Sequence, residues 1–172
     1  MTKLSTRRLF FACWPDEGIR RGIIERRGLI EGLSRRRVPD HNLHLTLLFL
    51  GNQPADRLPE LIEAADRLDG SGFVLRLDRF GWFPGARVAW LGGPAPEAAR
   101  GLVEQLSDSC RALGLRFDRG RFHPHVTLFR KVERRPVFPS VAELVWPVGE
   151  FALIESIPSR SYQVLRTWPL RL

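Results

Sequence analysis

The sequence contains few residues that could build a disulfide scaffold or a zinc site, and it has no long apolar run. Its two cysteines, Cys13 and Cys110, lack CxxC spacing, and each lies in an apolar segment. We therefore expect two buried free thiols. The longest apolar runs, such as residues 43–50, stop well before the roughly 18 residues that a membrane-spanning helix requires. The sequence thus predicts no transmembrane helix.

The pattern of a secretion signal is missing as well. Residues 1–8 are basic but lead directly into the patterned body of the chain, without an apolar stretch and a cleavage site of small residues. A chain of 172 residues is a little longer than one typical domain and can bury a core without covalent staples. Apolar residues make up 44% and charged residues 27% of it, which excludes disordered, collagen-like and coiled-coil proteins. We expect a folded cytoplasmic protein.

The charge balance indicates an anionic partner. The chain has 27 Lys and Arg against 19 Asp and Glu, a net charge of +8, and Arg supplies nearly all of the excess. Guanidinium groups form bidentate contacts with phosphate and stack on bases better than ammonium groups do. RNA or a nucleotide therefore ranks above a membrane surface as the partner. Composition leaves a second explanation open, because a genome rich in G and C encodes Arg freely.

Apolar patterning predicts the same order of elements twice. In the first half we expect a strand at Arg8–Trp14 and a helix from Pro15 to about Leu33, which the basic run Ser34–Arg37 breaks. A strand at Asn42–Leu50, bounded by Gly51, a helix at Pro59–Asp69 and a strand from Phe73 towards Gly81 are expected to follow. In the second half we expect a strand at Arg87–Leu91, a helix at Pro96–Leu113, a strand at Phe122–Arg130 and final strands at Phe151–Ile154 and Tyr162–Leu170, with an irregular segment at Pro136–Pro147. Arg8 precedes Arg87 by 79 residues and His44 precedes His125 by 81, which indicates an internal duplication.

Histidine is scarce and unevenly placed. The four histidines, His41, His44, His123 and His125, fall in two short segments. Residues two apart on a strand share a face, so His44 lies beside Thr46 while the neighbouring leucines point to the core. His125 lies beside Thr127 in the same way. Each half of the chain thus offers one imidazole and one hydroxyl to a common cavity.

Two such pairs suit in-line attack at a phosphodiester. A neutral histidine removes a proton from the nucleophile while a protonated one donates a proton to the leaving oxygen, and both titrate near neutral pH. The hydroxyls of Thr46 and Thr127 can donate hydrogen bonds to the non-bridging phosphate oxygens. This chemistry requires no metal ion.

Other interpretations of the histidines remain open from the sequence. A single His-x-Thr is usually a packing or surface feature, although two equivalent copies favour function. His123 and His125 share a strand face and could bind zinc together with His44, but no Cys, Asp or Glu stands at ligand spacing in either segment. His41 and His123 are expected to orient their neighbours at the strand entries. A non-catalytic module that binds a terminal RNA phosphate is the alternative to an enzyme.

The two motifs and their surroundings resemble a known superfamily. HLTL at 44–47 and HVTL at 125–128, within RLFFACW, NLHLTLLFLG, RVAWLG and FHPHVTLFR, resemble the 2H phosphoesterases and, among them, the bacterial RNA 2′,3′-cyclic phosphodiesterases, also called the 2′-5′ RNA ligase family. The resemblance covers nearly the whole chain. It implies an α+β fold, with one domain over residues 1–172 built of two pseudo-symmetric lobes. Each lobe is an antiparallel sheet backed by helices, and a cleft between the lobes holds both motifs.

The resemblance also implies an activity. The expected reaction is hydrolysis of an RNA or nucleoside 2′,3′-cyclic phosphate to a 2′-phosphomonoester, without metal or other cofactor, and the family name implies reversible 2′-5′ ligation. His44 corresponds to the proton donor to the 3′ oxygen and His125 to the acceptor that activates water. The expected partner is RNA with a 2′,3′-cyclic phosphate end, tRNA fragments among the candidates. We expect a monomer without membrane contact.

The resemblance further assigns substrate-binding positions. Thr46 and Thr127 match the positions that hold the phosphate, and Phe49 and Arg130, each five residues after its histidine, match contacts to the base. An aromatic ring and a guanidinium plane are both suited to stacking. In a regular strand these two side chains would face away from the histidines, so base binding requires a bulge or a strand end. Tyr162, the only tyrosine, is assigned to the core or the cleft rim without preference.

Overall fold

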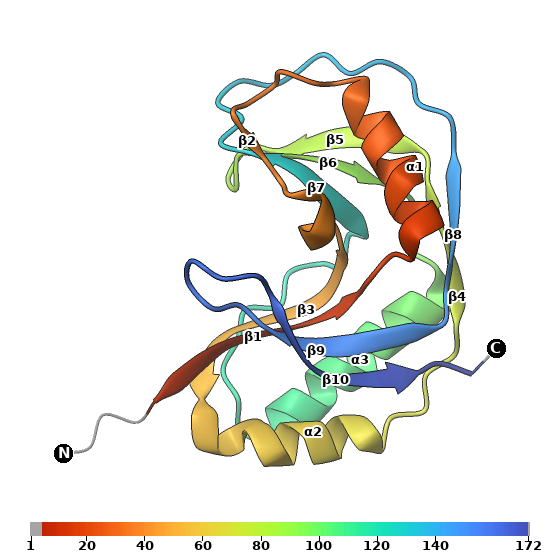
Figure 1. Ribbon diagram of the computed structural model, residues 1–172. Helices are drawn as coiled ribbons and strands as arrows, with labels where there is room; N and C mark the ends of the chain where they lie inside the picture. Colours follow the sequence, from red (N-terminus) through yellow and green to blue (C-terminus); the bar gives the residue numbers. More distant parts are fainter. Residues whose placement is uncertain (1–4, 172) are drawn as a thin grey trace.

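The computed structural model describes residues 5–171, in which three α-helices accompany a large antiparallel sheet (Figure 1). The strands are β1 (Thr6–Cys13), β2 (Arg36–Arg37), β3 (Leu45–Pro54), β4 (Phe73–Leu77), β5 (Arg79–Phe83), β6 (Val88–Gly92), β7 (His125–Arg130), β8 (Leu144–Val148), β9 (Glu150–Glu155) and β10 (Gln163–Pro169). The helices are α1 (Glu17–Gly28), α2 (Leu58–Asp66) and α3 (Glu97–Ala112), with short 3₁₀ turns η1 (Asp40–Asn42) and η2 (Ala55–Arg57).

The sheet is built of two lobes. Its strand order is β10-β9-β1-β3-β7-β6-β5, with β2 paired to β7, and all these pairs are antiparallel. The lobes meet where β3 and β7 share one residue pair, Leu45 with Val126, and they splay apart from this seam (Figure 1). Strands β4 and β8 form a separate two-stranded sheet. This arrangement confirms the predicted α+β fold of two antiparallel lobes.

Helices cover the lobes, and a common core joins them. Helix α3 contacts both α2 and β3, whereas α1 lies beside β8 (Figure 1). The buried face of α3 recurs every three to four residues, through Leu102, Val103, Leu106 and Cys110, as expected for an amphipathic helix. Helix α1 begins where the sequence predicts, because the Asp16 side chain accepts a hydrogen bond from the backbone N–H of Ile19 at 2.8 Å and so caps the first turn.

Several expected boundaries are wrong, and the single strand expected from Phe73 towards Gly81 is two strands, β4 and β5, which belong to different sheets. Helix α1 ends at Gly28 and not near Leu33, because glycine disfavours helix continuation and residues 29–33 form turns. The basic run contains the short strand β2, whose Arg36 pairs with Arg130. Strand β3 does not end at Gly51 but continues to Pro54. Gly51, with φ of +68°, lies beside a register shift against β1, and the pairing with β1 resumes beyond that shift.

The segment expected to be irregular, Pro136–Pro147, overlaps strand β8, which pairs with β4. Trp146 and Val148 are buried on one side of this strand, while Val145 and Pro147 are exposed on the other. Alternate residues are therefore buried, as in a half-buried strand, but all five residues are apolar and the proline among them is typical of irregular chain. Proline is accommodated because β8 has one strand neighbour and needs no further backbone donor there.

Cys13 and Cys110 are free and buried, which confirms the predicted thiols. Within residues 5–171 no helix is long and apolar enough to cross a membrane.

Candidate active site

The seam between the lobes lies directly beside both His-x-Thr motifs. Leu45 and Val126, which pair across it, are the residues that follow His44 and His125. Because the pair is antiparallel, continuing its register sets His44 opposite Thr127 and Thr46 opposite His125. Leu45 and Val126 are fully buried, so the histidines and threonines point to the other face. An approximate two-fold relation therefore brings the two motifs together.

A bulge in each lobe adds a further residue to this face. The register of β3 against β1 shifts by one residue at Leu47, and that of β7 against β6 shifts at Leu128. A bulge inserts one residue and so reverses the alternation of side chains beyond it. Accordingly two consecutive buried residues follow each threonine, and Phe49 and Arg130 return to the face of the histidines. These are the bulges that base binding by Phe49 and Arg130 requires.

A cavity of about 460 Å³ occupies this face. It is lined by Arg8, Phe10, His44, Thr46, Phe49, His125, Thr127, Arg130, Ser156 and Tyr162. All six residues that the sequence singles out as catalytic or substrate-binding thus line one cavity.

Sequence reasoning missed three lining residues and left a fourth undecided. The sequence pattern did not mark Arg8, Phe10 or Ser156 as site residues, although the spacing between the two halves was counted from Arg8 to Arg87. The Arg8 guanidinium lies 4.8 Å from the centroid of the Phe49 ring, within the range of a cation–π contact. Tyr162 belongs to the cavity wall.

Backbone carbonyls hold both catalytic candidates in one orientation. The Nδ1 atoms of His44 and His125 lie 2.6 Å from the carbonyl oxygens of Asn42 and His123, respectively, each two residues earlier in the chain. A carbonyl can only accept, so each Nδ1 carries a hydrogen and the neutral ring keeps its lone pair on Nε2. Nε2 of His44 lies 3.1 Å from Oγ1 of Thr46. Both rings therefore use Nε2 to gain or release a proton.

Aromatic rings enclose His44. Trp14 stacks on it with a centroid separation of 5.0 Å and an interplanar angle of 5°. Phe10 lies at 5.2 Å, and the Tyr162 ring meets it edge-on at 5.5 Å. These contacts fix the ring plane and displace water from it.

A second aromatic group supports His125. The Phe83 ring meets it edge-on at 5.0 Å, and Trp90 lies at 6.0 Å. Close approach of the Trp90 ring depends on glycine, since a Cβ atom at Gly81 would lie 2.1 Å from that ring and one at Gly92 would lie 2.8 Å from it. Strands β5 and β6 thus supply the aromatic surroundings of His125, as Phe10 of β1, Trp14 and Tyr162 do for His44.

Burial controls the charge of both imidazoles. It lowers the pKa of His44 to about 4, opposed by the hydrogen bond to Asn42 and assisted by the positive charges of Arg130 and His125. Burial also lowers the pKa of His125, opposed by its bond to His123. Desolvation disfavours the charged form of a histidine. Both rings are therefore neutral at neutral pH in the free protein.

A zinc site at these histidines lacks the necessary donors. Within residues 5–171 no three His, Cys, Asp or Glu side chains are grouped so as to hold a metal ion. His123 packs its ring against Trp90 at 4.7 Å, while its carbonyl orients His125. His41 is exposed on η1. The zinc interpretation of His44, His123 and His125 therefore has no support in the structure.

Known proteins with similar sequences and structures are phosphoesterases. Residues 14–90, which include the first His-x-Thr motif, match the family described as LigT like Phosphoesterase. The chain is 37% identical to the RNA 2′,3′-cyclic phosphodiesterase of Escherichia coli, over 95% of this chain and 96% of that protein. It is 36% identical to the enzyme of the same name from Thermus thermophilus, over 87% and 81%. The crystal structure of E. coli LigT with 3′-AMP superposes with a TM-score of 0.88 at 34% identity, over 96% of this chain and 99% of that one.

Proposed function

The chain belongs to the LigT-like phosphoesterase family, and on that premise we propose that it hydrolyses the 2′,3′-cyclic phosphate of RNA or a nucleoside to a 2′-phosphomonoester. The observation that carries the proposal is the pairing of two His/Thr arms across the β3–β7 seam in one cavity. Hydrolysis of a cyclic phosphate needs one proton acceptor, one proton donor and hydrogen bonds to the non-bridging oxygens. The two arms supply all three.

The phosphate binds between the two histidines. Thr46 and Thr127 donate hydroxyl hydrogen bonds to its non-bridging oxygens and stabilise the negative charge that grows there in the transition state. The negative charge of the bound phosphate raises the pKa of His44, because an opposite charge favours the imidazolium. Binding of substrate thus creates the protonated histidine that the free protein lacks at neutral pH.

Proton transfers then accompany in-line displacement. Nε2 of His125 takes a proton from a water molecule as the water oxygen forms a bond to phosphorus. The bond from phosphorus to the 3′ oxygen breaks, and Nε2 of His44 donates its proton to that oxygen. The product keeps phosphate on the 2′ oxygen, and a proton passes from His125 back to His44 through solvent. The assignment of donor and acceptor follows the family resemblance, since the geometry of the two histidines is nearly symmetric.

Aromatic and cationic groups hold the terminal nucleoside. Phe49 and Arg130 project into the cavity beyond the threonines, and Arg8 lies against the Phe49 ring. A base can stack on these planes with little regard to its identity. If a 5′-hydroxyl of a second RNA replaces the water, the same displacement joins the strands through a 2′-5′ linkage.

The proposed partner is RNA and the proposed compartment is the cytoplasm. The RNA substrate ends in a 2′,3′-cyclic phosphate, and tRNA fragments are one source of such ends. The two lobes act together as one domain, because a common core joins them, and the protein acts as a monomer. Free, buried thiols at Cys13 and Cys110 support a reducing compartment, the cytoplasm.

Turnover of a cyclic nucleotide in the presence of EDTA tests the function. We expect nucleoside 2′,3′-cyclic phosphates to yield the 2′-phosphate, identified by chromatography against both phosphate isomers. His44→Ala and His125→Ala serve as inactive controls whose folding is checked by circular dichroism. Tight binding of the nucleotide without product would indicate a non-catalytic phosphate-binding module. Activity that EDTA abolishes and zinc restores would indicate a metal enzyme.

A further inference from the structure

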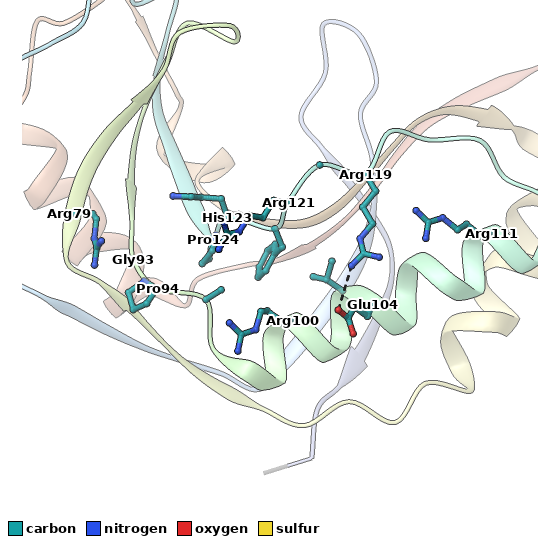
Figure 2. A pocket seen from close by; sticks show the side chains of 14 residues that line it. Arg79, Gly93, Pro94, Arg100, Glu104, Arg111, Arg119, Arg121, His123 and Pro124 are labelled. Atoms are coloured by element: carbon teal, nitrogen blue, oxygen red, sulfur yellow. Dashed lines mark ion pairs between the residues drawn. The ribbon is translucent and has the colours of Figure 1, made fainter.

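A second cavity, of about 880 Å³, lies between α3, the start of β5 and the loop before β7 (Figure 2). Five arginines line it, Arg79, Arg100, Arg111, Arg119 and Arg121, and we name it the arginine groove. Among the described residues the only carboxylate that lines it is Glu104. The groove therefore has a marked positive charge and suits an anionic ligand.

Acidic neighbours neutralise this charge only in part. Glu104 lies 3.8 Å from Arg119 (Figure 2), and Asp108 lies 3.9 Å from Arg111. Such exposed pairs contribute little and can be exchanged for a phosphate. Arg79 has a closer partner in Asp78 at 2.7 Å.

Two arginines of the groove keep a free positive charge. Within residues 5–171, Arg100 and Arg121 have no carboxylate within ion-pair distance. They lie on different elements, Arg100 on α3 and Arg121 in the loop before β7. An anion in the groove can therefore be contacted from both sides.

The groove continues into the active site. A smaller cavity of about 230 Å³ shares Thr46, Phe49 and His125 with the active-site cavity. It also shares Arg119, Arg121, Phe122 and His123 with the arginine groove. A linear ligand can therefore extend from the catalytic histidines to α3.

The length of the groove fits a polymer better than a single phosphate. Arg100 and Arg111 are eleven residues apart on α3, three helical turns, so they lie on the same helix face about 16 Å apart. One phosphate cannot contact both. Phe122, half-buried in the wall, offers a ring on which a base can stack.

We propose that the arginine groove binds the RNA nucleotides that lie 5′ to the terminal cyclic phosphate. The inference rests on the proposed function, which sets the reacting 3′ end between His44 and His125. From that point the strand extends only in the 5′ direction, through the smaller cavity and along α3. Successive phosphates contact the arginines, so the groove favours oligonucleotides over mononucleotides and reads no sequence.

The double variant Arg100→Gln, Arg111→Gln tests the groove away from the catalytic cavity. Glutamine keeps the helix propensity of arginine. We expect KM for an oligoribonucleotide 2′,3′-cyclic phosphate to rise by about three- to tenfold, the effect of two exposed charge contacts. Turnover of the matching cyclic mononucleotide stays unchanged. The control is Arg21→Gln, Arg67→Gln, which removes the same charge from exposed positions outside these cavities and leaves both substrates unaffected.

A binding measurement separates the groove from the proposed reaction. Fluorescence anisotropy with an RNA of about ten nucleotides that ends in a 2′-phosphate measures binding without turnover. The slope of log affinity against log salt concentration should be smaller by about 1.4 in the groove variant, which is about 0.7 for each lost phosphate contact. Wild-type binding and turnover of the oligonucleotide by the groove variant would overturn the inference. So would an equal loss for the mononucleotide or in the control. If the wild-type protein hydrolyses neither substrate, the proposed function is wrong, and the anisotropy result still decides the groove.

Discussion

His44 and His125 share one local geometry, in which a backbone carbonyl two residues earlier holds Nδ1 and leaves Nε2 to react. Because donor and acceptor act in one displacement, His44→Ala and His125→Ala should each lower kcat by about 10²- to 10⁴-fold. The double variant should lose less than the product of the single losses, since a reaction without its base gains less from its acid. Single-turnover rates with a cyclic nucleotide measure all three. A folded single variant with full activity would disprove the two-histidine mechanism.

The lowered pKa values of both histidines predict an unusual pH dependence. The pKa values of the free protein lie below 6.5, with that of His44 at about 4, so kcat/KM should be greatest below pH 6.5 and fall as rising pH deprotonates the donor. Bound phosphate raises the pKa of His44, so the basic limb of kcat should lie at higher pH than that of kcat/KM. His44→Ala should lose the basic limb and His125→Ala the acidic limb. Loss of the limbs in the opposite variants would mean that donor and acceptor are exchanged.

Trp14 keeps the His44 ring dry as well as oriented. The rings stack at 5.0 Å, and burial is the largest cause of the low pKa of His44. Trp14→Ala admits water, so the pKa should rise towards 6.5, the ordinary histidine value, as measured by NMR titration of the imidazole. Trp14→Phe, which retains an aromatic ring, is the matched control and should shift the pKa less. An unchanged pKa in Trp14→Ala would assign the desolvation to other neighbours.

At the level of elements, alternation and spacing predicted most of the strands but not the bulges. Apolar residues that alternate with His and Thr predicted the strand that carries each motif. The spacing of 81 residues between His44 and His125 indicated two equivalent halves. The bulges at Leu47 and Leu128 arise from pairing with β1 and β6, partners distant in sequence. Only the requirement that Phe49 and Arg130 reach the histidines suggested them. Strand β8 was missed because its five residues are all apolar, without polar alternation, and because Pro147 is typical of irregular chain.

Gly51, which lies beside the second register shift of β3 against β1, allows the backbone conformation there to be tested by substitution. Gly51 has φ of +68°, and a Cβ atom there would meet only Phe49, at 3.7 Å, so Gly51→Ala introduces backbone strain without a clash. Its free energy of unfolding should fall by about 1–2 kcal/mol. Gly101→Ala is the control, because Gly101 lies inside α3 with open space around it and alanine there should stabilise by about 0.5–1 kcal/mol. Urea unfolding measures both, and a shift in the same direction would refute the argument.

At the level of the whole molecule, the net charge of +8 predicted an anionic partner but not its location. The arginines of the groove come from β5, α3 and the loop before β7, segments up to 42 residues apart between Arg79 and Arg121. No local pattern in the sequence joins them. They converge because the fold sets α3 beside the start of β5 and the loop before β7. The candidate catalytic residues could be predicted because their motif is local, whereas the groove depends on tertiary structure.

Salt should therefore separate binding of the strand from the chemical step. Phosphates that contact arginine release counterions, so log kcat/KM for an oligoribonucleotide 2′,3′-cyclic phosphate should fall linearly with log salt, by about 0.7 for each contact. A cyclic mononucleotide has one phosphate in the cavity and should show a shallower slope. The kcat of the bound mononucleotide should change least, because the histidines and threonines around it are partly buried and screened less. Steady-state kinetics over a series of salt concentrations measures these dependences, and equal slopes for both substrates would show that the excess of arginine does not bind the strand.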